Sequence, residues 1–320
     1  MKKNVFLGAV FAAPLMAGAA FAADLPPVYE EAPAAYVTSQ WDAFISAKVG
    51  YSWFDSDSDV TGPGEGYDAD DWGFEARSSG AYTWANGIGF QGDLLFAWQN
   101  LGELSGEGET ISFDSKSADA AAHLFFRQPD SWLVGVFAQY GVTSLDFDFL
   151  GLDIDRGYLG LEGQAYLGAF TLYAQGGYAT ADFGGYLGGP GGGVDGDGFF
   201  LNGQVRWFAA PNWMIAGVAG YQTLEFDGVG GLGGGGGDID VWNVGLNTEY
   251  RLDNSPISLT LSYDYSNTDF GGGFETDENR VMAGIKLNLG TQTLIERDRA
   301  GASLDPVRPA TMVLGFPVVN

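Results

Sequence analysis

The sequence predicts an all-β protein, a transmembrane antiparallel up-and-down β-barrel of about twelve strands. Three observations carry this prediction. Segments of roughly ten residues alternate strictly between apolar and polar side chains, as strands with two different faces do. Aromatic residues gather at the ends of these segments, where a strand crossing a bilayer meets the two interfaces. The connections between the segments alternate between short and long.

Residues 199–221 show the repeating unit most clearly. Two strands are joined by a tight turn at 209–212. One face of the first strand is apolar, and the other carries Asn202, Gln204 and Arg206. Because a soluble sheet has no reason to place large aromatics at both ends of its strands, we interpret the segment as a transmembrane hairpin.

The same pattern recurs along most of the chain. The expected strands are 41–53, 72–84, 88–98, 117–127, 132–140, 158–167, 171–178, 199–208, 213–221, 242–252, 257–265 and 280–289. The tryptophans all fall at or beside strand ends, at Trp41, Trp53, Trp72, Trp84, Trp98, Trp132, Trp207, Trp213 and Trp242. A soluble β-sandwich is the alternative, but it would leave two aromatic bands facing water.

The connections indicate which end of the barrel faces which compartment. Short connections lie at 85–87, 128–131, 168–170, 209–212 and 253–256. Long ones lie at 54–71, 99–116, 142–155, 179–198, 222–238 and 266–277. Bacterial outer-membrane barrels have short periplasmic turns and long extracellular loops. Since a closed sheet leaves no unpaired edge in lipid, residues 41–290 are expected to form the barrel.

The N-terminus predicts export. Lys2 and Lys3 precede an apolar run at 5–21, and residues 20–22 read Ala-Phe-Ala, a small-residue cleavage site. Residues 1–22 are therefore expected to be a cleaved signal peptide, and the expected location is the cell outer membrane.

The barrel is flanked by two further segments. Residues 23–40 form a Pro-rich lead-in, expected to be extended and periplasmic. Residues 291–320 form a C-terminal tail in which Arg297, Arg299 and Arg308 are a local concentration of basic residues in an acidic chain. The tail is expected to be periplasmic or to pack into the lumen against Asp or Glu.

Composition narrows the possible partners. The formal net charge is −27, so nucleic acid is not an expected partner. The chain has no cysteine and one histidine, which leaves little room for zinc or thiol chemistry. No cofactor is expected. The expected partners are outer-membrane lipid, lipopolysaccharide and the barrel-assembly machinery.

The first long connection is strongly acidic. Asp55, Asp57 and Asp59 are spaced like the first ligands of a calcium loop. However, Val60 stands where the turn glycine would be and Gly66 where the bidentate Glu would be, so this is not an EF-hand. We expect a solvated anionic surface here, or a divalent-cation site that bridges to lipopolysaccharide phosphates.

The connection at 142–155 keeps the strand pattern. Asp146, Asp148, Asp153 and Asp155 alternate with apolar residues, and in register with the flanking strands the acids face outward. The pattern predicts a hairpin that stands above the membrane and leans its apolar face over the barrel mouth. An ordinary mobile loop is the alternative.

The inward faces supply the candidate pore lining. The expected pore-lining residues are Lys48, Arg77, Asp93, Asp119, His123, Glu162, Arg206, Arg280 and Lys286. Bases from the first, second and last strands would form a wall opposite acids from the third, fourth and sixth, which would orient and filter charged solutes. Alternatively, these charges pair and plug a limited lumen.

His123 is the only histidine, and an outer-membrane hydrolase is the rival class. A Ser-His-acid site needs a serine within hydrogen-bond reach, and the sequence offers no nucleophile motif. We therefore expect a structural or pore-lining histidine, and no enzymatic activity.

Several of these features resemble the small surface-antigen porins of alphaproteobacteria. The signal peptide, the expected mature start Ala23-Asp24-Leu25-Pro26-Pro27 and the aromatic-ended strands carry the resemblance. The chain departs from that family in two ways. The family usually has eight strands and ends in an aromatic residue, whereas here residues 282–289 resemble the assembly signal but have Leu in its place and a tail after it. The resemblance implies an outer-membrane location and says little about function.

The sequence therefore predicts a porin-like passive channel for small hydrophilic solutes. The acidic loops predict a preference for cations at low salt. The alternative is a non-conducting structural surface protein that interacts with lipopolysaccharide or divalent cations.

Overall fold

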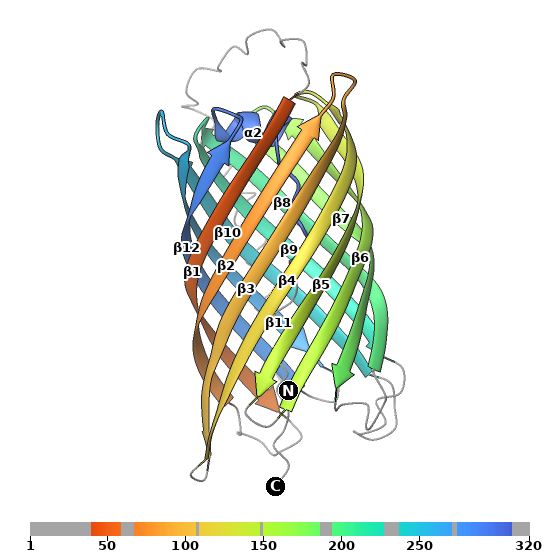
Figure 1. Cartoon of the computed structure of the whole chain (residues 1–320), viewed down its shortest axis with the longest axis vertical. Coiled ribbons are helices and arrows are strands. Elements are labelled where there is room, and N and C mark those ends of the chain that lie inside the picture. Colours follow the sequence, from red (N-terminus) through yellow and green to blue (C-terminus); the bar gives the residue numbers. More distant parts are fainter. Residues whose placement is uncertain are drawn as a thin grey trace, which may run out of the picture. The chain divides into compact units, whose positions relative to one another are not determined.

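The computed structural model describes residues 40–58, 67–106, 109–147, 150–185, 194–226, 237–270 and 274–308. Within these ranges twelve antiparallel strands close into a barrel in which sequence neighbours pair and the first strand pairs with the last (Figure 1). The predicted fold class is confirmed. The strands are β1 (Gln40–Ser58), β2 (Tyr67–Thr83), β3 (Ile88–Gly106), β4 (Glu109–Gln128), β5 (Trp132–Phe147), β6 (Leu150–Leu167), β7 (Phe170–Gly185), β8 (Val194–Ala210), β9 (Trp213–Phe226), β10 (Gly237–Arg251), β11 (Ile257–Asp269) and β12 (Phe274–Leu289). The predicted signal peptide and residues 23–39 of the predicted lead-in lie outside the described residues.

Four of the five short turns contain a residue with positive φ, at Gly87, Asp130, Gly168 and Asn254. Asp130 has φ 54° and Asn254 has φ 55°, a region in which Asp and Asn are enriched. Gly87 has φ 86°, and a Cβ there would lie 2.6 Å from the carbonyl oxygen of Arg127. These turns therefore join neighbouring strands without a long connection, as the sequence predicts.

The two faces of each strand alternate as expected. On β5, Trp132, Val136 and Tyr140 point outward and are exposed, whereas Leu133 and Gln139 point inward and are buried. Trp132 and Tyr140 stand at the two ends of an outer face whose centre is aliphatic. The outer surface of the barrel is therefore an apolar band with aromatic residues near its rims.

The strands run farther than the sequence analysis expected. β5 and β6 stay paired as far as Phe147 and Leu150, which places most of the predicted connection 142–155 in strands. The reason is that the alternation of side chains continues past the last membrane-facing aromatic. Within this hairpin Leu145 and Ile154 are buried and Asp153 is exposed. These positions confirm a hairpin whose apolar face points into the barrel.

The inward apolar residues at this end pack into a cluster that we call the mouth cluster. It joins residues from β5 to β10 with one residue near the C-terminus: Phe137, Leu145, Ile154, Tyr158, Ala179, Ala181, Phe183, Phe200, Leu224, Phe226, Ile239, Val241 and Val307. Phe183 and Phe226 meet edge to face with ring centroids 5.1 Å apart. This packing fills one side of the lumen toward the long-loop end.

After β12 the chain turns at Gly290 and forms the short helix α2 (Leu294–Ala300). The helix begins at Thr293, whose hydroxyl accepts a hydrogen bond from the backbone N–H of Glu296 at 3.2 Å. The backbone N–H groups of Leu294 and Ile295 donate to the carbonyl oxygen of Pro211, which fixes α2 at the short-turn end of the barrel (Figure 1). In the described part of the chain, no helix has the length and apolar character needed to cross a membrane.

Candidate functional site: the lumen and its inner segment

Residues 301–308, which we call the inner segment, continue from α2 into the barrel and have no regular secondary structure. Their side chains are mostly buried; Asp305 is partly exposed and Arg308 is exposed. The sequence analysis left the tail either periplasmic or lumenal. The structure places this part of it in the lumen.

Two inward-facing glutamines hold the backbone of the inner segment. The amide nitrogen of Gln91 on β3 donates to the Leu304 carbonyl at 2.7 Å, and its amide oxygen accepts from the Leu304 N–H at 3.1 Å. Gln139 on β5 makes the same pair of bonds to Val307, at 2.8 and 2.7 Å. Each side-chain amide thus satisfies one donor and one acceptor of a segment with no strand partner.

A third glutamine and an arginine hold Ser303. Gln164 on β6 donates to the Ser303 carbonyl at 3.0 Å and accepts from the Ser303 hydroxyl at 3.1 Å. Arg127 on β4 donates to the same hydroxyl at 2.9 Å and to the Gly301 carbonyl at 3.0 Å. The polar groups at the start of the inner segment are therefore met by the barrel wall.

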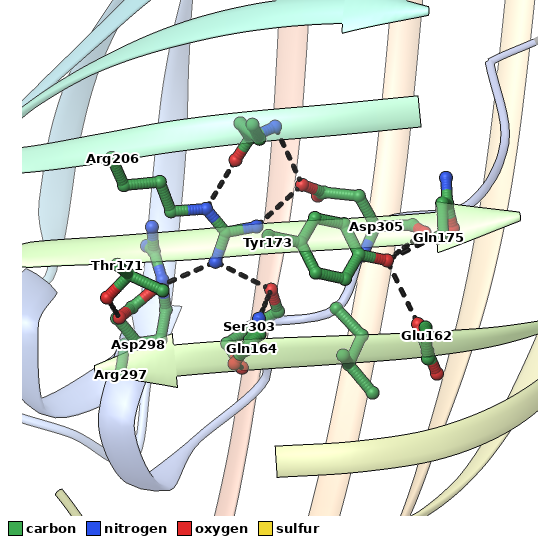
Figure 2. A network of polar contacts seen from close by, with 12 residues as sticks. Glu162, Gln164, Thr171, Tyr173, Gln175, Arg206, Arg297, Asp298, Ser303 and Asp305 are labelled. Carbon is green, nitrogen blue, oxygen red and sulfur yellow. Dashed lines mark hydrogen bonds and ion pairs between the residues drawn. The ribbon is translucent and has the colours of Figure 1, made fainter. Parts of the chain in front are cut away.

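Asp305 is clamped between two arginines, of which Figure 2 shows Arg206. Arg77 on β2 donates to one carboxylate oxygen at 2.6 Å, and Arg206 on β8 donates to the other at 2.9 Å. Gln204 adds a longer bond of 3.3 Å. Burial acts to raise the pKa of the Asp305 carboxyl, but the two guanidinium groups outweigh burial and hold that pKa below its usual value. Asp305 is therefore expected to stay ionised at neutral pH.

Two apolar side chains of the inner segment enter apolar pockets. Leu304 is fully buried against Leu133, Tyr166 and Tyr173, in a cluster that also includes Phe125. Val307 is buried in the mouth cluster. The segment is therefore held by both apolar and charged contacts.

Helix α2 is anchored by a buried carboxylate. Glu249 on β10 accepts two hydrogen bonds from Arg297, at 2.8 and 2.7 Å, and one from Lys286 on β12 at 2.7 Å. Both cations also lie near the ring of Phe44, with Lys286 Nζ 4.4 Å from its centroid. Arg206 on β8 adds a second anchor, since it donates to Asp298 of α2 at 2.7 Å.

His123 is fully buried between two carboxylates. Its Nδ1 lies 2.8 Å from Glu162, and its Nε2 lies 3.4 Å from Asp93, an ion-pair distance that is long for a hydrogen bond. The ring stacks on Phe137 with centroids 5.6 Å apart. Glu162 also accepts from the Tyr173 hydroxyl at 2.9 Å. This arrangement links β3, β4, β6 and β7 across the interior.

The structure pairs most of the other predicted pore-lining charges with partners on the adjacent strand or the next strand but one. The sequence analysis expected a basic wall opposite acidic groups. Instead, Lys48 lies 3.1 Å from Glu75 on β2, and Arg77 lies 2.8 Å from Asp93 on β3. Asp119 pairs with Arg156 at 3.2 Å. Antiparallel register explains the difference, because residues directly opposite on paired strands, such as Lys48 and Glu75, reach each other before they reach across the lumen.

Two adjoining cavities remain beside the inner segment. The larger, of about 170 Å³, is lined by residues of β1 to β3, β7 to β12, α2 and the inner segment, including Asp305 and Arg308. The smaller, of about 50 Å³, lies nearer the long-loop end and includes Arg280. Both are lined by Asn202, Asn243, Asp264 and Arg308. The space left in the lumen therefore borders the inner segment, and most of the residues that line it are polar or charged.

The predicted cation site is only partly within the described residues. Asp55 lies on β1 and is exposed, whereas Asp59 and the side chain of Asp57 lie outside the described residues. Among the residues that the structure describes, no three metal-ligating side chains converge.

Sequence reasoning missed the glutamines and Glu249. Gln91, Gln139 and Gln164 sit at inward positions of their strands, and Glu249 does so on β10, so alternation marks them as lumenal. However, the residues that these side chains contact are distant in the sequence. Gln91 and Leu304, for example, are separated by 213 residues. The signal that pointed to the tail was its three arginines in an acidic chain.

Comparison with solved structures places the fold. The outer-membrane channel COG4313 from Pseudomonas putida F1 aligns with a TM-score of 0.51 and 9% identity, covering 83% of this chain and all of that one. The chain has the fold of an outer-membrane β-barrel. The translocator domain of the autotransporter NalP from Neisseria meningitidis aligns at a TM-score of 0.46 with 12% identity, covering 87% of this chain and 97% of that one. The P. putida toluene transporter TodX aligns at 0.42 with 11% identity, covering 79% and 90%. No protein-family model and no curated protein matches the sequence.

Proposed function

We propose that this protein is an outer-membrane passive channel for small hydrophilic solutes, narrowed by its own inner segment. The observation that carries the proposal is the pair of adjoining cavities along the wall from β8 to β12, which are lined mostly by polar and charged residues. A barrel that served only as a scaffold would be more stable if apolar side chains filled this space. The name of COG4313 as an outer-membrane channel agrees with the proposal.

The proposed orientation follows from the turns. The short turns and α2 would face the periplasm, and the long connections would face outward. Solutes would pass along the side of the lumen that the inner segment leaves open, past Lys48, Glu75 and Asp264. This path supports small solutes rather than large ones.

The proposed selectivity is for cations. The described residues near the long-loop end include many exposed acids, among them Asp153, Asp155, Asp195, Asp197, Glu225 and Asp238. A mouth of this charge raises the local cation concentration, and the effect weakens as salt shortens the Debye length from about 10 Å at 0.1 M to about 3 Å at 1 M.

The channel is tested in planar bilayers. Folded protein should produce resolved current steps, and in a KCl gradient the reversal potential should have the sign for K⁺ selectivity. The preference should shrink between 0.1 and 1 M salt. The absence of current steps from protein that is folded and inserted would contradict the channel.

The membrane location is tested by charge on the outer face. Leu161 on β6 is 69% exposed and opposite Val136, midway between Trp132 and Tyr140. Leu161→Arg should lower the free energy of unfolding in lipid vesicles by about 2–4 kcal/mol, as measured by denaturant titration. The matched control is Leu167→Arg at the end of the same strand, with an expected cost of about 0–1 kcal/mol. Equal effects of the two substitutions would argue against a membrane at this height.

A non-conducting structural role is the second candidate. It is favoured by the buried ion pairs and by the inner segment, which together occupy much of the lumen. In that case the partners would be lipopolysaccharide or divalent cations at the acidic end, and assembly would use the barrel-assembly machinery. For His123 we propose a structural role and no catalysis, since both of its ring nitrogens face carboxylates.

A further inference from the structure

We propose that the lumen wall from β2 to β8 is a binding site for an extended peptide, and that residues 301–308 occupy it as a tethered, displaceable ligand. The site would recognise an apolar residue, an acidic residue and a second apolar residue two positions later. Here these are Leu304, Asp305 and Val307. The binding site itself does not depend on conduction; only its effect on current rests on the proposed channel function.

Backbone recognition is the first argument. Gln91 and Gln139 each bond both the N–H and the C=O of one residue of the inner segment. This is how peptide-binding edges hold extended ligands, with side-chain amides here in place of a strand. Such contacts fit an extended backbone whatever its side chains are.

Side-chain recognition is the second argument. Leu304 fills an apolar pocket, Val307 enters the mouth cluster, and Asp305 meets two arginines from separate strands. Pockets for alternate side chains combined with backbone bonds are the usual basis of specificity in extended-peptide sites. A charge-assisted bond from each guanidinium makes the acidic position the most selective.

The segment can leave without breaking the barrel, because the strands do not need it for their own pairing. Neighbouring strands are joined in a closed ladder, and the inner segment takes no part in it. The connection that precedes α2 contains the exposed residues Gly290 and Gln292. Asp305 keeps a third of its side chain exposed to the larger cavity. Departure of the segment would join its space to that cavity and widen the path.

The direct test separates the segment from the barrel after folding. A protease site is inserted after Gly290 in the full chain, which is folded first and then cut. A fluorescent synthetic peptide with the sequence of residues 291–308 should then exchange onto the cut barrel. The same peptide with Asp305→Ala should bind at least about tenfold more weakly, because both arginines lose their partner. No exchange, or equal binding of the two peptides, would overturn the proposal.

A second test uses the uncut chain, which has no native cysteine. Ala302 is buried, so Ala302→Cys should react slowly with a hydrophilic thiol reagent. Adding Asp305→Ala should raise the reaction rate at least about tenfold. The matched control is Asp253→Ala in an exposed turn at the same end, which should leave the rate unchanged. An unchanged rate in the Asp305→Ala chain would show that the segment is a fixed part of the core.

The two proposals fail separately. Peptide exchange without any current through the emptied barrel would support the proposed peptide site and contradict the proposed channel. Current through the uncut chain, together with no exchange of the peptide, would support the proposed channel and contradict the proposed peptide site.

Discussion

Glu249→Ala is expected to lower the free energy of unfolding by about 3–5 kcal/mol, because it removes the carboxylate that two buried cations share. Glu249 is 2% exposed and accepts three hydrogen bonds, two from Arg297 and one from Lys286. No other carboxylate is in ion-pair contact with either cation among the described residues. The loss should also free α2 from β10, since Arg297 is its charged contact with that strand.

The measurement is denaturant titration of protein folded in lipid vesicles, followed by tryptophan fluorescence. Glu225→Ala is the matched control, because Glu225 is exposed on the neighbouring strand, and its effect should stay within about 0.5 kcal/mol. Glu249→Gln keeps the side-chain shape and an acceptor oxygen, so we expect a smaller loss than for alanine. A loss below about 1 kcal/mol for Glu249→Ala would mean that water or rearranged side chains satisfy both cations.

The architecture could be predicted from local patterns. In residues 199–221, alternation assigned Asn202, Gln204 and Arg206 to one face, and the structure places all three toward the lumen, where they line the larger cavity. This works because the period of a strand is two, so a few residues fix the face of every other residue. Most of the short turns were equally local, since residues that accept positive φ mark four of the five.

Strand length was harder to predict. The expected strands ended at the outermost aromatic residues, but β5 continues seven residues beyond Tyr140 to Phe147. An aromatic residue marks the position of the membrane interface, whereas a strand ends where its backbone no longer has a paired strand to hydrogen-bond. Beyond the membrane the hairpin partner is still present, so pairing continues.

The interior of the lumen could be predicted least. Arg77 and Asp305 are 228 residues apart, and nothing near either residue in the sequence specifies the other. The inner segment has no periodicity, because it is held by side chains rather than by a strand. The three arginines of the tail indicated contacts with acidic groups of the lumen, but the residue held by two ion pairs is one of the tail's own acids, Asp305.

The other large effect is expected at His123. The imidazole is fully buried and lies 2.8 Å from Glu162 and 3.4 Å from Asp93. His123→Ala removes a hydrogen-bond partner of Glu162, opens a cavity beside Phe137 and weakens the connection between β4 and β6. We expect a loss of about 3–5 kcal/mol in the free energy of unfolding. His123→Gln, which keeps a donor for Glu162, should lose less.

The double variant His123→Leu with Glu162→Gln tests whether the pair of His123 and Glu162 stabilises the fold through its charge or through packing. If the cost of the single variant comes from leaving a buried carboxylate unpaired, neutralising that carboxylate should recover part of the stability, so the double variant should be more stable than His123→Leu alone. Tyr173 can still donate to the glutamine oxygen, so its hydroxyl keeps a partner. Additive losses in the double-mutant cycle, measured by the same denaturant titration, would instead show that the histidine acts through its packing on Phe137.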